Sequence, residues 1–518
     1  MFLRHQLIHL ILAATAISFP EAHLGPVVDL GYAQYQGTVS AANISHFLGI
    51  QYAAAPLGDL RFCAPQPPAN VPGVQQATTQ PKQCFQAWWG TSPTNPLETR
   101  AAVASSEDCL FLNVYSSGDA PGTTVGNLPV LVYIHGGGYV AGKASAYNGE
   151  DIIKQSNRGL VVVIIQYRLG VFGFLSGAEV KNKGALNAGL LDQDFALRWV
   201  NKHIAKFGGD PSKVTIWGES AGAGSVLQHV VANDGKTEPQ LFRGAMTSSI
   251  FLPSQYEYNH RIPELLFREV VAQTSCTTAT DSMVCLRATD ANTLQAANKK
   301  ISKGGFWGTF LFLPVVDGSF IRQRATLSLL QGKVNGVRTY FVNQSTEATA
   351  NATQYALDLF PGFGAVHASE VGSIYASLGT ELFQENAIQG ESIFICPTYL
   401  LLRAFTGAAF KAEFAIQPAL HADDLPYYWP SLATPSYQNR DFINAFTQTF
   451  TSFAISQDPN MKINPATITP RWEKWDLGHT EMLFNETAGV PVVKPVMTSN
   501  ALLERCRFWD SVGHKTAQ

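Results

Sequence analysis

The chain has 518 residues, of which 46% are hydrophobic and 14% charged, a composition that provides a large apolar core. Its 36 Lys and Arg residues nearly balance 39 Asp and Glu residues, for a net charge of −3. This balance argues against nucleic acid as a partner. The sequence contains no internal repeat, low-complexity linker or long run of like charge.

The N-terminus has the pattern of a secretory signal. Arg4 and His5 precede a largely apolar stretch from Leu7 to Phe19, which is too short to span a bilayer. We therefore expect residues 1–22 to be a signal peptide, cleaved between residues 16 and 22, and no stable membrane anchor. The protein is expected to be secreted or to reside in the secretory pathway.

Four N-x-S/T sequons fit a secreted glycoprotein. Asn343 ends a short apolar run and is expected to be buried and unmodified. Glycosylation is expected at Asn43, Asn351 and Asn485.

A glycine-rich segment follows the first strongly predicted strand. Residues 130–134 (Val-Leu-Val-Tyr-Ile) are typical of a buried strand and lead into His135-Gly136-Gly137-Gly138. Three glycines at such a position allow backbone N–H groups to turn toward a developing oxyanion. A phosphate-binding loop does not fit, because neither G-x-G-x-x-G nor Gly-Lys-Ser/Thr occurs here.

The most informative motif is Gly-Glu-Ser-Ala-Gly at residues 218–222, directly after the apolar run 214–217. A G-x-S-x-G pentapeptide between a strand and a helix is a nucleophile elbow, in which small residues flank a serine on a sharp turn. Residues 223–231 can form that helix. The motif predicts Ser220 as a nucleophile, and the N–H groups of Gly137, Gly138 and Ala221 as an oxyanion hole.

A serine nucleophile needs a histidine base. When the serine lies on a nucleophile elbow, the histidine follows it in the sequence. Four histidines lie far enough downstream: His367, His421, His479 and His514. His421 comes after the apolar run 414–417 and opens a loop, whereas His479 lies in a turn and His514 near the end of the chain. We therefore predict His421 as the base.

The acid that orients the base should lie between the serine and the histidine. Glu347 comes just after the short apolar run 340–343 and is the first candidate. Asp317 and Asp424 are rivals, although the surroundings of both favour a role in a turn or at a loop edge.

Several further blocks resemble the type-B carboxylesterases, the group that includes cholinesterases and fungal lipases. Residues 107–115 (Glu-Asp-Cys-Leu-Phe-Leu-Asn-Val-Tyr) are similar to the family's E-D-C-L-x-L-N-V, and residues 167–175 to its Y-R-x-G-x-F-G-F-L. The matches are dense over residues 107–224 and sparser up to residue 427. One departure is Ala422, where the family more often has a glycine beside the base.

The resemblance implies an α/β-hydrolase fold: a large, mostly parallel central sheet flanked by helices, with loop and helical insertions forming a gorge. It places the nucleophile on Ser220, the acid on Glu347 and the base on His421. Because these three residues must meet in one site, we expect residues 23–518 to form a single domain.

The cysteines are expected to pair in an oxidising compartment. By resemblance, Cys84 and Cys109 form the family's first disulfide, and Cys276 and Cys285 would close a second, small loop. Cys396 and Cys506 are a possible third pair, which the sequence leaves open. Cys63 would then be unpaired and buried.

The substrate site is less well defined by the sequence. Trp88 and Trp89 could line the gorge, and Phe310 resembles part of the acyl pocket of cholinesterases. Glu219 either forms an internal hydrogen bond or faces a cationic substrate. Only 24 residues separate Cys84 from Cys109, where the family's lipases carry a longer lid loop, so an esterase is favoured over a lipase.

These observations predict a secreted serine hydrolase that cleaves small or lipophilic carboxylic esters through an acyl-enzyme. Neither cofactor nor metal is expected, since no His, Cys or carboxylate cluster has ligand spacing. The alternatives are a lipase, a biosynthetic acyltransferase or transesterase, and a non-catalytic binding homologue, a class that usually lacks the serine. The expected partner is a small-molecule ester, and the sequence leaves the oligomeric state open.

Overall fold

A mixed sheet of 11 strands forms the centre of the computed structural model, which describes residues 25–92, 104–118, 126–306, 308–343, 356–357, 359–360 and 362–518. In spatial order the strands are β16 (Val490–Met497), β15 (Thr480–Thr487), β14 (Ala409–Phe414), β13 (Arg338–Asn343), β12 (Gly244–Ser248), β11 (Gly209–Glu219), β9 (Leu128–Ile134), β10 (Val161–Ile165), β8 (Phe111–Ser117), β4 (Ile44–Gln51) and β3 (Thr38–Val39). All pairs from β15 to β10 are parallel, and the outer pairs are antiparallel. The predicted large, mostly parallel sheet is confirmed.

The central strands are buried on both faces. In β9, Val130, Val132 and Ile134 pack into one hydrophobic cluster. Leu131 and Tyr133 pack into a second cluster on the opposite face. Successive side chains of a strand point to opposite sides, so a continuously apolar run is what a sheet covered on both faces requires.

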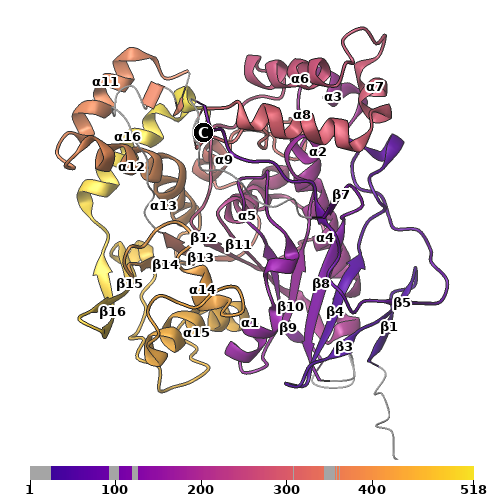
Figure 1. The fold of residues 1–518 in the computed structure, drawn as a ribbon. Coiled ribbons are helices and arrows are strands. Elements are labelled where there is room, and N and C mark those ends of the chain that lie inside the picture. The colour runs from indigo at the N-terminus through magenta and orange to yellow at the C-terminus, as the bar shows by residue number, and fades with distance from the viewer. Residues whose placement is uncertain are drawn as a thin grey trace, which may run out of the picture.

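Helices cover both faces of the sheet. One face packs against α4 (Ala188–His203) and α5 (Ala221–Val231). The other packs against α1 (Gly149–Gln155), α14 (Leu425–Tyr428) and α15 (Arg440–Ser456), which lie at the bottom of Figure 1.

The remaining helices are mostly insertions at the top of Figure 1. There, α6–α8 form one group and α11, α12 and α16 another, with the C-terminus between them. Their bounds are α2 (Gly170–Phe174), α3 (Ala178–Lys183), α6 (Arg261–Gln273), α7 (Ser282–Ala288), α8 (Ala291–Lys303), α9 (Ala325–Leu330), α11 (Gly364–Tyr375), α12 (Glu381–Gln389), α13 (Cys396–Ala404) and α16 (Asn500–Thr516). A π-helical segment, Gly390–Ile395, joins α12 to α13. A separate three-stranded sheet contains β1 (Val27–Asp29), β2 (Gln34–Gln36) and β5 (Val74–Gln76). A two-stranded sheet contains β6 (Gln83–Cys84) and β7 (Ser105–Ser106).

Three disulfides link the chain: Cys84–Cys109, Cys276–Cys285 and Cys396–Cys506. The third pair, left open by the sequence, ties α13 to α16. Cys63 carries a free thiol, but the prediction that it is buried is wrong. It is partly exposed, and its Sγ lies 3.3 Å from the carbonyl oxygen of Asp59, because its loop runs along the surface.

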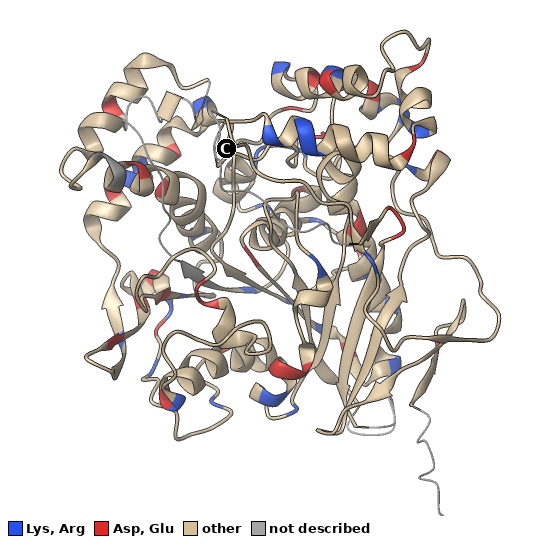
Figure 2. Ribbon diagram, in the orientation of Figure 1, with Lys and Arg blue, Asp and Glu red and all other residues tan. Residues whose placement is uncertain are grey.

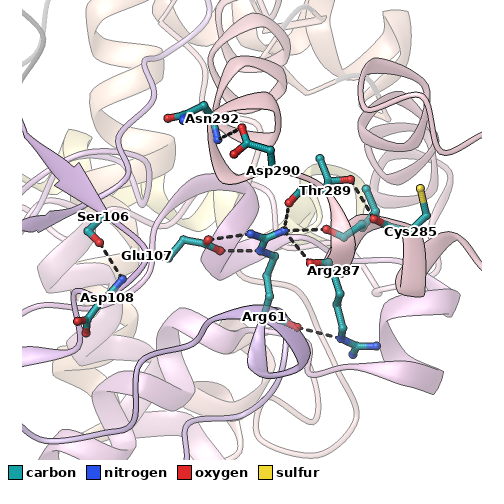
Figure 3. A network of polar contacts seen from close by, with 10 residues as sticks. Arg61, Ser106, Glu107, Asp108, Cys285, Arg287, Thr289, Asp290 and Asn292 are labelled. Atoms are coloured by element: carbon teal, nitrogen blue, oxygen red, sulfur yellow. Dashed lines mark hydrogen bonds and ion pairs between the residues drawn. The ribbon is translucent and has the colours of Figure 1, made fainter.

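The Glu-Asp-Cys block has a structural use in this fold (Figure 3). The guanidinium of Arg61 donates to both carboxylate oxygens of Glu107, at 2.6 and 2.7 Å. Its remaining Nη1 donates to the carbonyls of Leu286, Arg287 and Thr289 at the end of α7. A buried, fully paired arginine therefore fastens the loop after β4 to the Cys276–Cys285 region.

Lys and Arg are interspersed with Asp and Glu over the ribbon in Figure 2. Of the helices that the structure describes, none combines the length and the apolarity needed to cross a membrane.

Some expected features fall outside the described residues, namely the signal peptide and Asn351. Asn43 is exposed in the turn before β4. Asn485 is half-buried in β15, where its Oδ1 accepts a hydrogen bond from the N–H of Glu486. Glycosylation at these positions stays a prediction.

Candidate active site

Ser220 is the one residue between the end of β11 and the start of α5. Its backbone has φ 55° and ψ −124°, a conformation that non-glycine residues rarely adopt. Hydrogen bonds hold it there: its N–H donates to the carbonyl of Ser248 at 3.0 Å, and its carbonyl accepts from Gly224 at 2.8 Å. Such maintained strain is typical of a functional turn, and it leaves the serine partly exposed.

The glycines on either side of Ser220 are required by contact. A Cβ on Gly222 would lie 2.0 Å from the carbonyl oxygen of Ile134, the last residue of β9. A Cβ on Gly218 would lie 2.3 Å from the backbone of Gly222. Contact with β9 at Gly222, and contact within the turn at Gly218, leave no room for a larger residue at either position.

The glycine segment after β9 lies against the elbow. A Cβ on Gly136 would be 2.6 Å from the carbonyl oxygen of Glu219 and 3.0 Å from the Cβ of Ser220. Gly137 and Gly138 have φ of 107° and 62°, which favour glycine. Within the part of the chain that the structure describes, the N–H groups of Gly137, Gly138 and Ala221 donate to no other residue.

His421 lies beside the residue that precedes the serine. Its Nε2 is 3.2 Å from Oε1 of Glu219. Burial lowers the pKa of His421 to about 4. Burial, and then the charge of Asp424, raise the pKa of the Glu219 carboxyl well above its usual value. Burial therefore favours the neutral form of both groups.

The backbone beside the histidine is also unusual. Ala422 has φ 75°, in the left-handed region that glycine adopts without cost. Ala422 therefore adopts the backbone conformation that suits the glycine more common at this position in the family.

The two rival acids have different surroundings. Asp317 accepts from the N–H groups of Ser319 and Phe320, as expected for a turn. Asp424 lies in the turn that leads directly into α14. It is fully buried at the start of α14, because residues 420–428 fold inward against the sheet. Burial and the charge of Asp424 raise the pKa of the neighbouring Tyr428 well above its usual value.

Glu347 lies outside the described residues. The strand that precedes it, β13, runs parallel between β12 and β14. The segments that leave β11, β13 and β14 therefore depart from the same edge of the sheet, where ligands of open α/β sheets bind.

A cavity of about 550 Å³ adjoins this edge and is lined by His421. Aromatic rings connect its lining residues. Centroids of Trp89 and Phe310 are 6.4 Å apart, of Phe310 and Phe251 5.3 Å, of Phe251 and Phe394 5.6 Å, and of Phe394 and His421 4.9 Å. A continuous aromatic path thus leads from the Cys84–Cys109 loop to the histidine.

Of the four residues predicted to contact substrate, Trp89 and Phe310 line the cavity. Trp88 packs edge-on against Trp89, at 5.6 Å, and is not among the described lining residues; nor is Glu219. Phe310 also lies against the glycine segment, since a Cβ on Gly138 would be 2.0 Å from its ring. The ring therefore closes one side of the space in front of Gly138.

Residues 25–371 match the model of the carboxylesterase family. The chain belongs to this family. It is 30% identical to carboxylesterase patB of Aspergillus clavatus, covering 94% of this chain and 96% of that protein. It is 34% identical to secreted lipase 1 of Botryotinia fuckeliana, but this match covers 60% of the chain and only 57% of the lipase.

Solved structures agree with this assignment. A crystal structure of Aspergillus niger EstA has a TM-score of 0.83 and 30% identity, covering 96% of this chain and 99% of that chain. A PNB esterase, at 23% identity and TM-score 0.76, supports the fold alone. This carboxylesterase-family member is therefore a carboxylesterase-type hydrolase with the expected α/β-hydrolase fold.

Phe251 and Phe394 also line the cavity of this carboxylesterase and were not predicted from the sequence. Phe251 lies three residues after the end of β12, and Phe394 lies in the π-helical segment. Neither position carries a motif that distinguishes it from ordinary core. A π-helical turn is frequent at functional sites, but it is visible only in the structure. Among the described residues, no group of three or more His, Cys, Asp or Glu could hold a metal ion.

Proposed function

We propose that this carboxylesterase is a secreted serine hydrolase that uses Ser220, His421 and Glu347 to cleave small or lipophilic esters. The observation that carries the proposal is the strained turn at Ser220, faced by three backbone N–H groups without acceptors among the described residues. Such donors are costly to leave without a partner unless water or a ligand accepts from them.

In the proposed reaction, Oγ of Ser220 attacks the ester carbonyl while His421 takes its proton. The N–H groups of Gly137, Gly138 and Ala221 stabilise the oxyanion of the tetrahedral intermediate. Its collapse breaks the bond to the alcohol, which leaves with the proton from His421. Water then attacks the acyl-enzyme, with His421 again as base, and releases the acid.

Glu347 would orient the His421 ring and stabilise the imidazolium without taking its proton. Glu219 is poorly suited to that role, because burial favours its neutral form. The proposal therefore assigns the orientation of the base to another carboxylate.

The cavity supports a lipophilic substrate. Its described lining contains no Asp, Glu, Lys or Arg, and is built mainly from aromatic and aliphatic side chains. A volume of about 550 Å³ is in the range for small-molecule sites. A neutral apolar acyl or alcohol group is therefore favoured over a cationic one.

Secretion is supported by the signal-like N-terminus and the three disulfides. A relative named as a secreted lipase agrees with it. N-terminal sequencing of protein recovered from the medium of expressing cells tests this part directly. A mature chain that begins just after residues 16 to 22 is expected, and a chain retained in the cells with residues 1–22 intact would contradict it.

The catalytic part is tested by labelling with a fluorophosphonate, followed by peptide mass spectrometry. Wild-type protein should be labelled stoichiometrically at Ser220, and Ser220→Ala should be unlabelled and inactive. Ser176→Ala is the matched control, because Ser176 lines the same cavity but lies outside the elbow. Folded wild-type protein that stays unlabelled would refute the proposal.

Substrate choice is tested with p-nitrophenyl esters of increasing chain length, with and without an added alcohol. Hydrolysis of soluble short and medium chains is expected. Activation at an oil–water boundary would identify a lipase instead, and dominant transfer to the alcohol would identify a transesterase.

A further inference from the structure

Two separate segments form the wall of the cavity nearest the histidine. The segment after β12 carries Phe251, and the π-helical segment carries Phe394, whose ring is 4.9 Å from that of His421. A single backbone hydrogen bond joins them directly, from the N–H of Leu252 to the carbonyl of Ile393, at 3.0 Å. The relative position of the two phenylalanines depends on how firmly these segments are held together.

The side chain of Gln518 supplies a second connection. Its Nε2 donates to the carbonyl of Leu252 at 2.7 Å and to the carbonyl of Ser392 at 2.9 Å. Leu252 and Ser392 are each next to a residue that lines the cavity. Gln518 is only 5% exposed, so water does not replace these bonds readily.

The backbone around Gln518 is itself anchored. Its main-chain oxygen accepts from Arg324 at 3.0 Å and from Thr326 at 2.6 Å. The two preceding carbonyls accept from Ser254 and Gln255, which continue the Phe251 segment. The disulfide between Cys396 and Cys506 further ties α16 to α13. The backbone that carries the Gln518 carboxamide is therefore well fixed. Forming the two side-chain hydrogen bonds then costs little conformational entropy.

We propose that Gln518 is a positioning residue that sets the width of the substrate cavity and the place of Phe394 against His421. The proposal rests on the proposed function for the identity of the substrate. The hydrogen bonds of Gln518 do not depend on the catalytic reaction. Loss of the carboxamide leaves two buried carbonyls without a donor, and the segments must separate to admit water. That separation changes which acyl chains fit.

The test compares Gln518→Met, which keeps the length of the side chain and removes both donors, with wild type. The matched control is Ser511→Ala, an exposed position on α16, the helix that precedes Gln518. We expect the ratio of kcat/KM for p-nitrophenyl octanoate to that for the acetate to change by about fivefold or more in Gln518→Met. The change should lie mainly in KM for the octanoate, and Ser511→Ala should leave the ratio unchanged.

A second measurement does not require turnover. The dissociation constant of the neutral dye Nile red for the cavity should change at least about threefold in Gln518→Met and remain constant in Ser511→Ala. If Gln518→Met fails to fold, Gln518→Asn takes its place, since it keeps the donors but is one methylene too short to reach both carbonyls. An intermediate shift is then expected.

Unchanged selectivity and dye affinity in a folded variant would overturn the role of Gln518. An equal loss of activity toward both esters, with unchanged dye affinity, would also overturn it, because a merely structural contribution predicts that result. Wild-type protein that neither reacts with the fluorophosphonate nor hydrolyses any ester would refute the proposed function alone. The dye measurement would still decide the role of Gln518.

Discussion

Substitution of Gly138 by alanine tests the proposed oxyanion hole most directly. The added methyl group would lie 2.0 Å from the ring of Phe310, whereas carbon atoms in contact are about 3.5 to 4.0 Å apart. Either the ring or the backbone of Gly138 must therefore move by about 1.5 Å or more. The φ of 62° adds a further cost, of about 1 kcal/mol, for a non-glycine residue.

The expected decrease in kcat follows from losing the hydrogen bond that the N–H of Gly138 donates to the oxyanion. Loss of one oxyanion donor costs about 10²- to 10³-fold in kcat, or about 2.7 to 4 kcal/mol. We expect Gly138→Ala to lower kcat for p-nitrophenyl butyrate by that factor, with a smaller effect on KM, because the interaction is made chiefly in the transition state.

Two variants separate the clash from the strain. Gly318 has a similar φ of 74° with no atom within 4 Å of an added Cβ, so Gly318→Ala carries the backbone cost without a collision. It should lower stability by about 1 kcal/mol and leave kcat unchanged. The double variant Gly138→Ala/Phe310→Ala removes the ring and should recover kcat by about tenfold or more relative to Gly138→Ala.

The assays are steady-state kinetics and thermal unfolding of all four proteins. A Gly138→Ala enzyme with kcat within about threefold of wild type would refute the assignment of this N–H to the oxyanion. A double variant no faster than Gly138→Ala would refute the collision with Phe310 as the cause.

Two further predictions concern charge. Glu347→Gln should lower kcat by up to about 10⁴-fold and move the acid limb of kcat/KM to lower pH, because an ionised Glu347 favours the imidazolium whereas burial lowers the pKa of His421 to about 4. The base acts only when neutral, so an acid limb that stays in place or moves to higher pH would contradict the role of Glu347. Arg61→Met should destabilise the protein by about 3 to 5 kcal/mol in denaturant unfolding, since it leaves the buried Glu107 carboxylate unpaired. Joint replacement of Glu107 by Gln should recover part of the loss, and a loss below about 1 kcal/mol would show that Arg61 is not the anchor of that region.

The sequence predicted those parts of the site in which local residues dictate backbone geometry. The elbow at Ser220 was predictable because glycine is required at 222 by contact with β9 and at 218 by contact with Gly222 within the turn. Gly137 and Gly138 were recognisable for the same reason, since their positive φ values exclude most other residues.

Contacts between distant segments were not predictable in the same way. The position of Glu219 beside His421 depends on the loop after β14 folding back over the elbow, and no local pattern encodes that fold. Asp424 reads as a polar loop residue, although it is buried by the packing of α14 against the sheet. Gln518 reaches the carbonyls of Leu252 and Ser392 only because α16 packs beside the π-helical segment and α13, which are far from it in sequence.

The chain of rings from Trp89 to His421 has a consequence for attempts to alter this enzyme. Each ring rests on the next, although the four aromatic residues come from segments separated by tens to hundreds of positions. Energies of substitutions at touching side chains rarely add. The effects of single substitutions would therefore predict the best combinations poorly. Libraries should vary Phe251, Phe310 and Phe394 together.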